Sequence, residues 1–288
     1  MRVTAEADPG QLDLGAFDLV IVLHLRRGAA LLRAVADLPH RPHLIGAVSG
    51  TDLYLEPGID AELVAECDAL VTLQAESRRA LPAGLQARTR VILQSAASPQ
   101  VHPTPRDDVF EVCVLAHLRA VKDPLLPAKA SELLPESSRI RILHAGAVLD
   151  PGLGKRAAEL SRDLPRWSWL GALDRGAAAE LLGHSKVCLV PSLAEGGAAV
   201  LTEAIVAGVA VVASRVPGNV GVLGEDHPGL FPAGDAEALA SILSRAENDG
   251  AFLEHLRARS RELAPRFAPP VERQAWRELL EDLERSPS

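Results

Sequence analysis

Short apolar runs alternate with helix-like stretches along almost the whole chain, and this alternation limits the fold more than any other feature. In the first third, runs of strand length stand at residues 17–24, 42–50, 67–74 and 90–96. Further along, comparable runs stand at 110–118, 139–146, 167–173, 186–192 and 209–214. Strands separated by helices are typical of βαβ units around a parallel sheet. The sequence therefore predicts an α/β protein.

A proline-rich stretch at residues 98–108, SPQVHPTPRDD, divides the two sets of runs and is typical of an interdomain linker. The simplest architecture is two Rossmann-like, doubly wound domains with a cleft between them. We expect an N-terminal domain at 1–104 and a second domain at 105–268. Residues 269–288 begin with prolines and carry apolar side chains at helical spacing, so we expect a C-terminal helix there that crosses back to the N-terminal domain.

Composition and charge exclude several classes of protein. The 288 residues are 48% hydrophobic, which excludes a disordered chain, and the formal net charge of −8 argues against a nucleic-acid partner. The three cysteines lie far apart without CxxC spacing, so we expect buried thiols in a reducing compartment rather than metal ligands. No apolar run reaches the roughly 18 residues of a membrane span, and the N-terminus lacks a signal-peptide core. These features predict a cytoplasmic protein.

The stretch AEGGAAVLTEAIVAG at residues 194–208 places two acids, Glu195 and Glu203, around a glycine pair and an apolar helix. It follows a buried strand, and ligands of open α/β sheets bind beyond the carboxyl ends of strands. Gly196 and Gly197 allow close approach to a ligand, and the N–H groups that start the helix, at Ala198, favour an anion. A buried Glu203 could bind a ligand diol. Alternatively, Glu195 caps the helix and Glu203 points outward; spacing alone leaves both open.

This pattern resembles the donor site of retaining glycosyltransferases with the two-domain GT-B fold, of the glycogen-synthase and sucrose-synthase type. The resemblance implies that Glu195 contacts the donor sugar and that Glu203 binds the ribose of a nucleotide. It assigns the donor diphosphate to Arg119 and Lys122, which follow the first strand of the second domain. Fixed cations there would stabilise the charge of the leaving diphosphate; a solvated basic loop is the alternative. The chain contains no Asp-x-Asp, so we expect neither a metal nor a further cofactor.

A second group of polar residues follows the first two strands of the N-terminal domain. Arg26 and Arg27 are expected to open a helix and to attract an anionic acceptor, although solvated arginines would fit equally. His24 could touch the sugar or the acceptor, or be structural. Thr51 and Asp52 stand where a strand enters a loop; Asp52 could accept from a sugar hydroxyl or serve as a helix cap or turn residue.

Across residues 17–232 the order of LHLRRG, SGTDLY, TLQAES, ILQSA, HLRAVKDPLL and EGGAAVLTEAI resembles the selenosugar synthases of selenoneine biosynthesis. The resemblance implies transfer of N-acetylglucosamine from a UDP-sugar to selenophosphate. Two rivals remain: a glycosyltransferase with a hydroxyl acceptor such as a lipid or polysaccharide, and a nucleotide-sugar-binding module without turnover. Members of the resembled family open with a further βα unit, so we also expect about 30 to 45 residues upstream and a disturbed sheet beside residues 17–23.

Overall fold

The computed structural model describes residues 10, 12–54, 58–98 and 108–285, which divide into two compact units. Unit 1 comprises Met1–Gln94, Glu195–Gly197 and Pro270–Ser288, and unit 2 comprises Ser95–Ala194 and Ala198–Pro269. The two units thus divide at Gln94 rather than at residue 104. Most of the expected proline-rich linker lies outside the described residues.

Unit 1 is built on a four-stranded, wholly parallel sheet whose strand order follows the chain, β1-β2-β3-β4. The strands are β1 (Leu19–Leu23), β2 (His43–Ala47), β3 (Ala69–Thr72) and β4 (Thr89–Val91). The helices are α1 (Ala29–Ala36), α2 (Gly50–Tyr54), α3 (Ala61–Ala65), α4 (Ala75–Arg79), α5 (Ala83–Gln86) and α13 (Pro269–Arg285). All four strands expected from the sequence are confirmed. The expected gap beside β1 is not found within these strands: the sheet is unbroken, and β1 is its edge strand.

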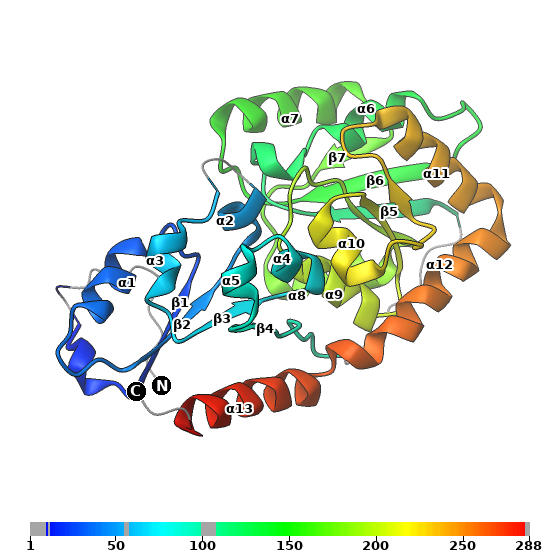
Figure 1. The fold of residues 1–288 in the computed structure, drawn as a ribbon. Coiled ribbons are helices and arrows are strands. Elements are labelled where there is room, and N and C mark those ends of the chain that lie inside the picture. The colour runs from blue at the N-terminus through cyan, green and yellow to red at the C-terminus, as the bar shows by residue number, and fades with distance from the viewer. Residues whose placement is uncertain (1–9, 11, 55–57, 99–107, 286–288) are drawn as a thin grey trace. The chain divides into compact units, whose positions relative to one another are not determined.

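Both faces of the unit 1 sheet are covered, by different parts of the chain. On one face, Leu32 and Val35 of α1 and Val64 of α3 pack with Leu44 and Leu70. Because right-handed crossovers between strands that follow in one direction place their helices on the same face, the other face needs a separate cover. The last helix, α13, provides it (Figure 1): Leu279 and Leu283 are buried with Ile45, Val71 and other residues of the sheet.

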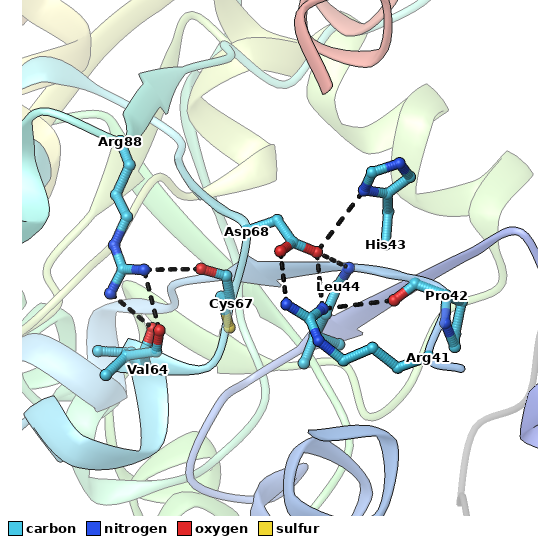
Figure 2. A network of polar contacts seen from close by, with 9 residues as sticks. Arg41, Pro42, His43, Leu44, Val64, Cys67, Asp68 and Arg88 are labelled. Atoms are coloured by element: carbon cyan, nitrogen blue, oxygen red, sulfur yellow. Dashed lines mark hydrogen bonds and ion pairs between the residues drawn. The ribbon is translucent and has the colours of Figure 1, made fainter. Parts of the chain in front are cut away.

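The amino ends of β2 and β3 are tied together by a charged network (Figure 2). Asp68 accepts two hydrogen bonds from the Arg41 guanidinium, at 2.8 and 2.6 Å, and a third from the backbone N–H of Leu44 at 2.7 Å. Arg88 donates to the carbonyls of Ala65, Cys67 and Val64, the last residues of α3 and the segment after it. This network lies at the end of the sheet opposite the one where parallel strands bind ligands, so we assign it to stability.

Unit 2 is built on a six-stranded parallel sheet with the order β10-β9-β8-β5-β6-β7. Its strands are β5 (Phe110–Leu115), β6 (Ile140–Ala145), β7 (Trp167–Trp169), β8 (Val187–Val190), β9 (Ala210–Ser214) and β10 (Leu230–Phe231). Its helices are α6 (Leu126–Glu132), α7 (Pro151–Asp163), α8 (Arg175–His184), α9 (Ala199–Val206), α10 (Pro217–Leu223), α11 (Ala236–Asn248) and α12 (Gly250–Leu263). The α/β class and the five expected strands are confirmed; β10, with only two residues, was not predicted.

Candidate functional site

The strand order of unit 2 identifies where a ligand binds most readily. The chain runs from β5 to β6 and β7 on one side of the sheet, and β8 then returns to pair with β5 on the other side. The order therefore reverses between β5 and β8. Helices that leave neighbouring strands in opposite directions at such a point open a crevice at the carboxyl ends of the strands. Two of the sequence-predicted segments follow these two strands.

The first segment carries Arg119 and Lys122 and follows β5. Leu118 donates from its backbone N–H to the Ala147 carbonyl at 2.9 Å, which holds the segment against the loop after β6. Asp123 closes a short 3-10 turn over Ala120–Lys122 in the left-handed conformation, with φ of 43°. The half-buried Arg119 has an Nε that is inaccessible to solvent and has no hydrogen-bond partner among the described residues. A buried guanidinium N–H without a partner is suited to receive an anionic ligand.

The second segment follows β8 and is bonded directly to the first. The backbone N–H of Leu193 donates to the carbonyl of Val121 at 2.9 Å. The segment that leads to Glu195 and the segment that carries the two cations therefore share a hydrogen bond at the carboxyl ends of β8 and β5. Because Val121 lies between Arg119 and Lys122, this hydrogen bond couples the positions of the two segments.

Helix α9 begins after Ala198, which occupies the cap position without a side-chain hydrogen bond. Glu195 therefore does not occupy the cap position of this helix. The expectation of a buried Glu203 is wrong, because Glu203 lies on the exposed face of α9 while Leu201, Ala204 and other neighbours are buried. Even so, partial desolvation raises the pKa of the Glu203 carboxyl, and the positive charge of Arg175 acts in the opposite direction.

Glu195, Gly196 and Gly197 belong to unit 1, whereas Ala198 and Glu203 belong to unit 2. Glu195 is buried, with 7% of its surface exposed. Within unit 1, a Cβ added to Gly196 would lie 2.3 Å from the backbone nitrogen of Gly50, so only glycine fits there. The predicted donor residues thus do not all fall within one unit: Arg119, Lys122, Ala198 and Glu203 belong to unit 2.

In unit 1 the structure brings the predicted acceptor residues together after β1 and β2. The sequence predicted that Arg26 and Arg27 open a helix, and this prediction is wrong. They lie in a turn closed by the hydrogen bond from Gly28 N–H to the His24 carbonyl at 2.9 Å, and α1 starts only at Ala29. His24 adopts φ of 58°, a left-handed conformation that is uncommon for a residue with a side chain. Strained positions of this kind often mark functional turns.

Asp52 fixes this turn from the next strand end. Its buried carboxylate accepts from the backbone N–H groups of Leu25 at 3.2 Å, Arg26 at 3.1 Å and Ser49 at 2.8 Å, and from the Ser49 hydroxyl at 2.8 Å. The Ser49 hydroxyl also lies 2.9 Å from that of Thr51. Of the two roles left open by the sequence, the turn role is therefore the one observed. The N–H groups of Leu25 and Arg26, which an anion could otherwise bind, are occupied by this carboxylate.

A pocket of about 250 Å³ lies beside the turn, between α1 and α3. Leu25, Ala29, Ile59 and other apolar side chains line it together with Arg26 and Arg33. One nitrogen of the Arg26 guanidinium donates to the Gly58 carbonyl at 3.3 Å, so Arg26 holds the wall of the pocket. Both arginines are exposed, but Arg26 makes this wall contact, so Arg27 is the better candidate for meeting an external anion.

The described part of the chain contains no group of three or more side chains of His, Cys, Asp or Glu arranged to hold a metal ion. No helix in it has the length and apolar character that crossing a bilayer requires.

Comparison with known proteins identifies the family. The model of the glycosyl transferases group 1 matches residues 100–263, more than half of the chain. The chain belongs to this family. No curated protein matches the sequence directly. The matched region spans β5 to α12, so it includes both segments at the strand-order reversal.

Solved glycosyltransferase structures share the fold at low identity. Anabaena Alr3699/HepE in complex with UDP and glucose has a TM-score of 0.78 at 18% identity, over 93% of this chain and 79% of that one. Sucrose-phosphate synthase from Thermosynechococcus elongatus has a TM-score of 0.77 at 20% identity, over 94% and 75%. The trehalose-6-phosphate synthase OtsA has a TM-score of 0.73 at 15% identity, over 93% and 72%. These similarities support the GT-B fold with two Rossmann-like domains.

The sequence pattern did not predict two features of this glycosyltransferase. Arg175 at the start of α8 influences Glu203 across 28 positions of the sequence, which no local pattern reveals. Ser214, the last residue of β9, is fully buried. A polar residue at the carboxyl end of an apolar strand was the only signal available for it.

Proposed function

We propose that this glycosyltransferase uses a UDP-sugar as donor, with N-acetylglucosamine as the sugar. The observation that carries the proposal is the pair of cations after β5 together with the glutamate on the helix after β8, on either side of the strand-order reversal. The fold neighbour HepE has been solved with UDP and glucose, which supports a uridine nucleotide. In this proposal Glu203 binds the ribose and Glu195 binds the sugar. Arg119 and Lys122 bind the diphosphate. The backbone of Gly196, Gly197 and Ala198 contacts the sugar.

The proposed acceptor is a small anion, selenophosphate, and the product a selenosugar. The bond between the anomeric carbon and the diphosphate oxygen breaks, and its electron pair leaves with UDP. A lone pair of selenium forms the new carbon–selenium bond, which leaves the phosphate attached through selenium. Attack of water on phosphorus then breaks the phosphorus–selenium bond and releases inorganic phosphate and the selenosugar. Negative charge therefore grows on the leaving diphosphate, and Arg119 and Lys122 stabilise it through preorganised charge. Neither a metal nor an enzyme nucleophile takes part in this scheme.

Arg27 and Arg26 are the proposed acceptor-side cations, with His24, Thr51 and Asp52 shaping their turn. Two guanidinium groups on a single turn attract a phosphate-like anion to a protein whose net charge is negative. The three free, buried cysteines support a reducing compartment, and we propose the cytoplasm.

One observation favours the rival with a hydroxyl acceptor of apolar character. On the edge strand β1, Leu23 and Ile21 are 67% and 41% exposed. An apolar strip on the surface of unit 1 could contact a lipid or the apolar part of a larger acceptor.

Product analysis distinguishes the two acceptors. The protein is incubated with UDP-N-acetylglucosamine and selenophosphate, and the mixture is analysed by mass spectrometry for a selenium-containing sugar. Its appearance supports the proposal. If UDP is released and sugar is transferred only when an alcohol or a lipid is supplied, the rival is correct.

A further inference from the structure

In unit 2, the peptide group that joins Ser192 to Leu193 is hydrogen-bonded through both its N–H and its C=O. Its N–H, on Leu193, donates to the Val121 carbonyl at 2.9 Å. Its C=O, on Ser192, accepts from the Ser214 hydroxyl at 2.5 Å. The peptide therefore lies between the end of β9 and the segment that carries Arg119 and Lys122.

Asn219 extends this chain of bonds. Its Nδ2 donates to the Ser214 carbonyl at 2.9 Å and to the Ser214 hydroxyl oxygen at 3.1 Å. Because the Ser214 hydroxyl accepts from Asn219, its own proton is directed to the Ser192 carbonyl. Ser192, Ser214 and Asn219 are 1%, 0% and 0% exposed, so water cannot replace a lost bond.

We propose that Ser214 and Asn219 are positioning residues, which hold the Ser192–Leu193 peptide so that the Arg119–Lys122 segment bonded to it keeps its position during sugar transfer. This inference rests on the proposed function for its effect on turnover. Buried polar networks that are well bonded fix a single conformation, and small displacements of reacting groups are costly in rate. Neither residue needs to touch the substrate for this role.

Ser260, on α12, offers a matched control, because its hydroxyl bonds to the chain next to the other end of β9. Ser260 is also 0% exposed, and its hydroxyl donates to the carbonyl of Val209, just before β9, at 2.7 Å. Ser214→Ala and Ser260→Ala each remove a buried hydroxyl with two hydrogen bonds: Ser214 loses those to Ser192 and Asn219, and Ser260 loses those to Val209 and Leu256. They should therefore lower the free energy of unfolding by similar amounts, and only Ser214→Ala should disturb the candidate site.

The experiment measures amide hydrogen exchange at Leu193 and steady-state turnover of UDP-N-acetylglucosamine with selenophosphate in wild type, Ser214→Ala, Asn219→Ala, the double variant and Ser260→Ala. We expect Ser214→Ala to speed exchange at Leu193 by about tenfold or more, because local opening becomes easier. We expect it to lower kcat about 10- to 100-fold with KM for the donor nearly unchanged. Asn219→Ala should act in the same direction, and the double variant should be less than additive in both readouts.

The two readouts separate this proposal from the proposed function. If Leu193 exchanges alike in Ser214→Ala and Ser260→Ala, the positioning role is wrong, whatever the activity. If exchange responds to Ser214→Ala while kcat is unchanged, it is also wrong. If the wild type turns over no UDP-sugar, the proposed function fails, and exchange alone decides whether Ser214 holds the peptide.

Discussion

The carboxylate of Asp52 accepts a hydrogen bond from the backbone N–H of Arg26 at 3.1 Å, across 26 positions of the sequence. Together with its bonds to Leu25 and Ser49, this contact ties the turn after β1 to the start of α2. A carboxylate bonded to several backbone N–H groups is a strong structural element. The turn that presents Arg26 and Arg27 is therefore built by Asp52, and its shape does not depend on a helix.

Replacing Asp52 with alanine should lower the free energy of unfolding by about 2 to 4 kcal/mol, since several buried N–H groups lose their acceptor. Asp60→Ala is the control: Asp60 caps α3 by accepting from Glu62 and Leu63, and its loss should cost only about 1 kcal/mol. Denaturant titration measures both. Equal costs for the two variants would contradict the role assigned to Asp52.

Arg27→Ala and Arg26→Ala should differ in their effect on stability. Arg27→Ala should raise KM for selenophosphate, or for thiophosphate as its sulfur analogue, about tenfold or more and change stability by less than about 0.5 kcal/mol. Arg26→Ala should also lower stability, because its guanidinium holds the Gly58 carbonyl. Kinetics at varied acceptor concentration, with thermal unfolding alongside, test this. An unchanged acceptor KM in Arg27→Ala would exclude Arg27 from the acceptor site.

Glu203→Ala should weaken binding of UDP, whereas Glu195→Ala should chiefly lower kcat. Hydrogen bonds to ribose act in the ground state and the transition state alike, but a contact near the reacting carbon acts mainly in the transition state. Isothermal titration calorimetry with UDP measures the first effect, and Glu237→Ala, in the first turn of α11, serves as a control. UDP affinity equal to wild type in Glu203→Ala would rule out the ribose assignment.

The Asp68 network predicts a pH dependence of stability. Burial raises the pKa of the Asp68 carboxyl, but the hydrogen bonds from Arg41 and the Leu44 N–H outweigh it, so the net pKa is lowered. A carboxyl with a lowered folded-state pKa stabilises the protein above its unfolded pKa, near 4, and loses this contribution as pH falls through the folded value. Asp68→Asn should therefore cost about 2 kcal/mol at pH 7 and progressively less below about pH 4.

The exposed Asp282 provides the comparison for Asp68. It pairs with Arg90 and Arg285 at the surface, so Asp282→Asn should change stability little at any pH. Urea denaturation across the acid range measures both variants. A cost of Asp68→Asn that stays constant down to pH 2 would show that the carboxylate charge is not what stabilises the amino ends of β2 and β3.

Most of the fold could be predicted because buried parallel strands are nearly continuous apolar runs, as at Val187–Val190 and Ala210–Ser214. The candidate site was predictable only in outline. Arg119 and Glu203 follow strand ends, and the apolar pattern predicts where the strands end. That Glu203 lies on the exposed face of α9 depends on how α9 packs, which the pattern does not give. The bonds of Asp52 to Leu25 and of Leu193 to Val121 join segments distant in sequence, so no local spacing encodes them.

We propose that this glycosyltransferase transfers sugar from a UDP-sugar to a small selenium- or sulfur-containing phosphate. The most direct measurement is the rate of UDP release from UDP-N-acetylglucosamine, with and without selenophosphate or thiophosphate, in the wild type and in Arg119→Ala. We predict that the anion raises the rate in the wild type at least about tenfold, and that Arg119→Ala lowers it about 100-fold or more, because a charge-stabilising contact is lost. UDP release that is independent of either anion, or unaffected by Arg119→Ala, would contradict the account.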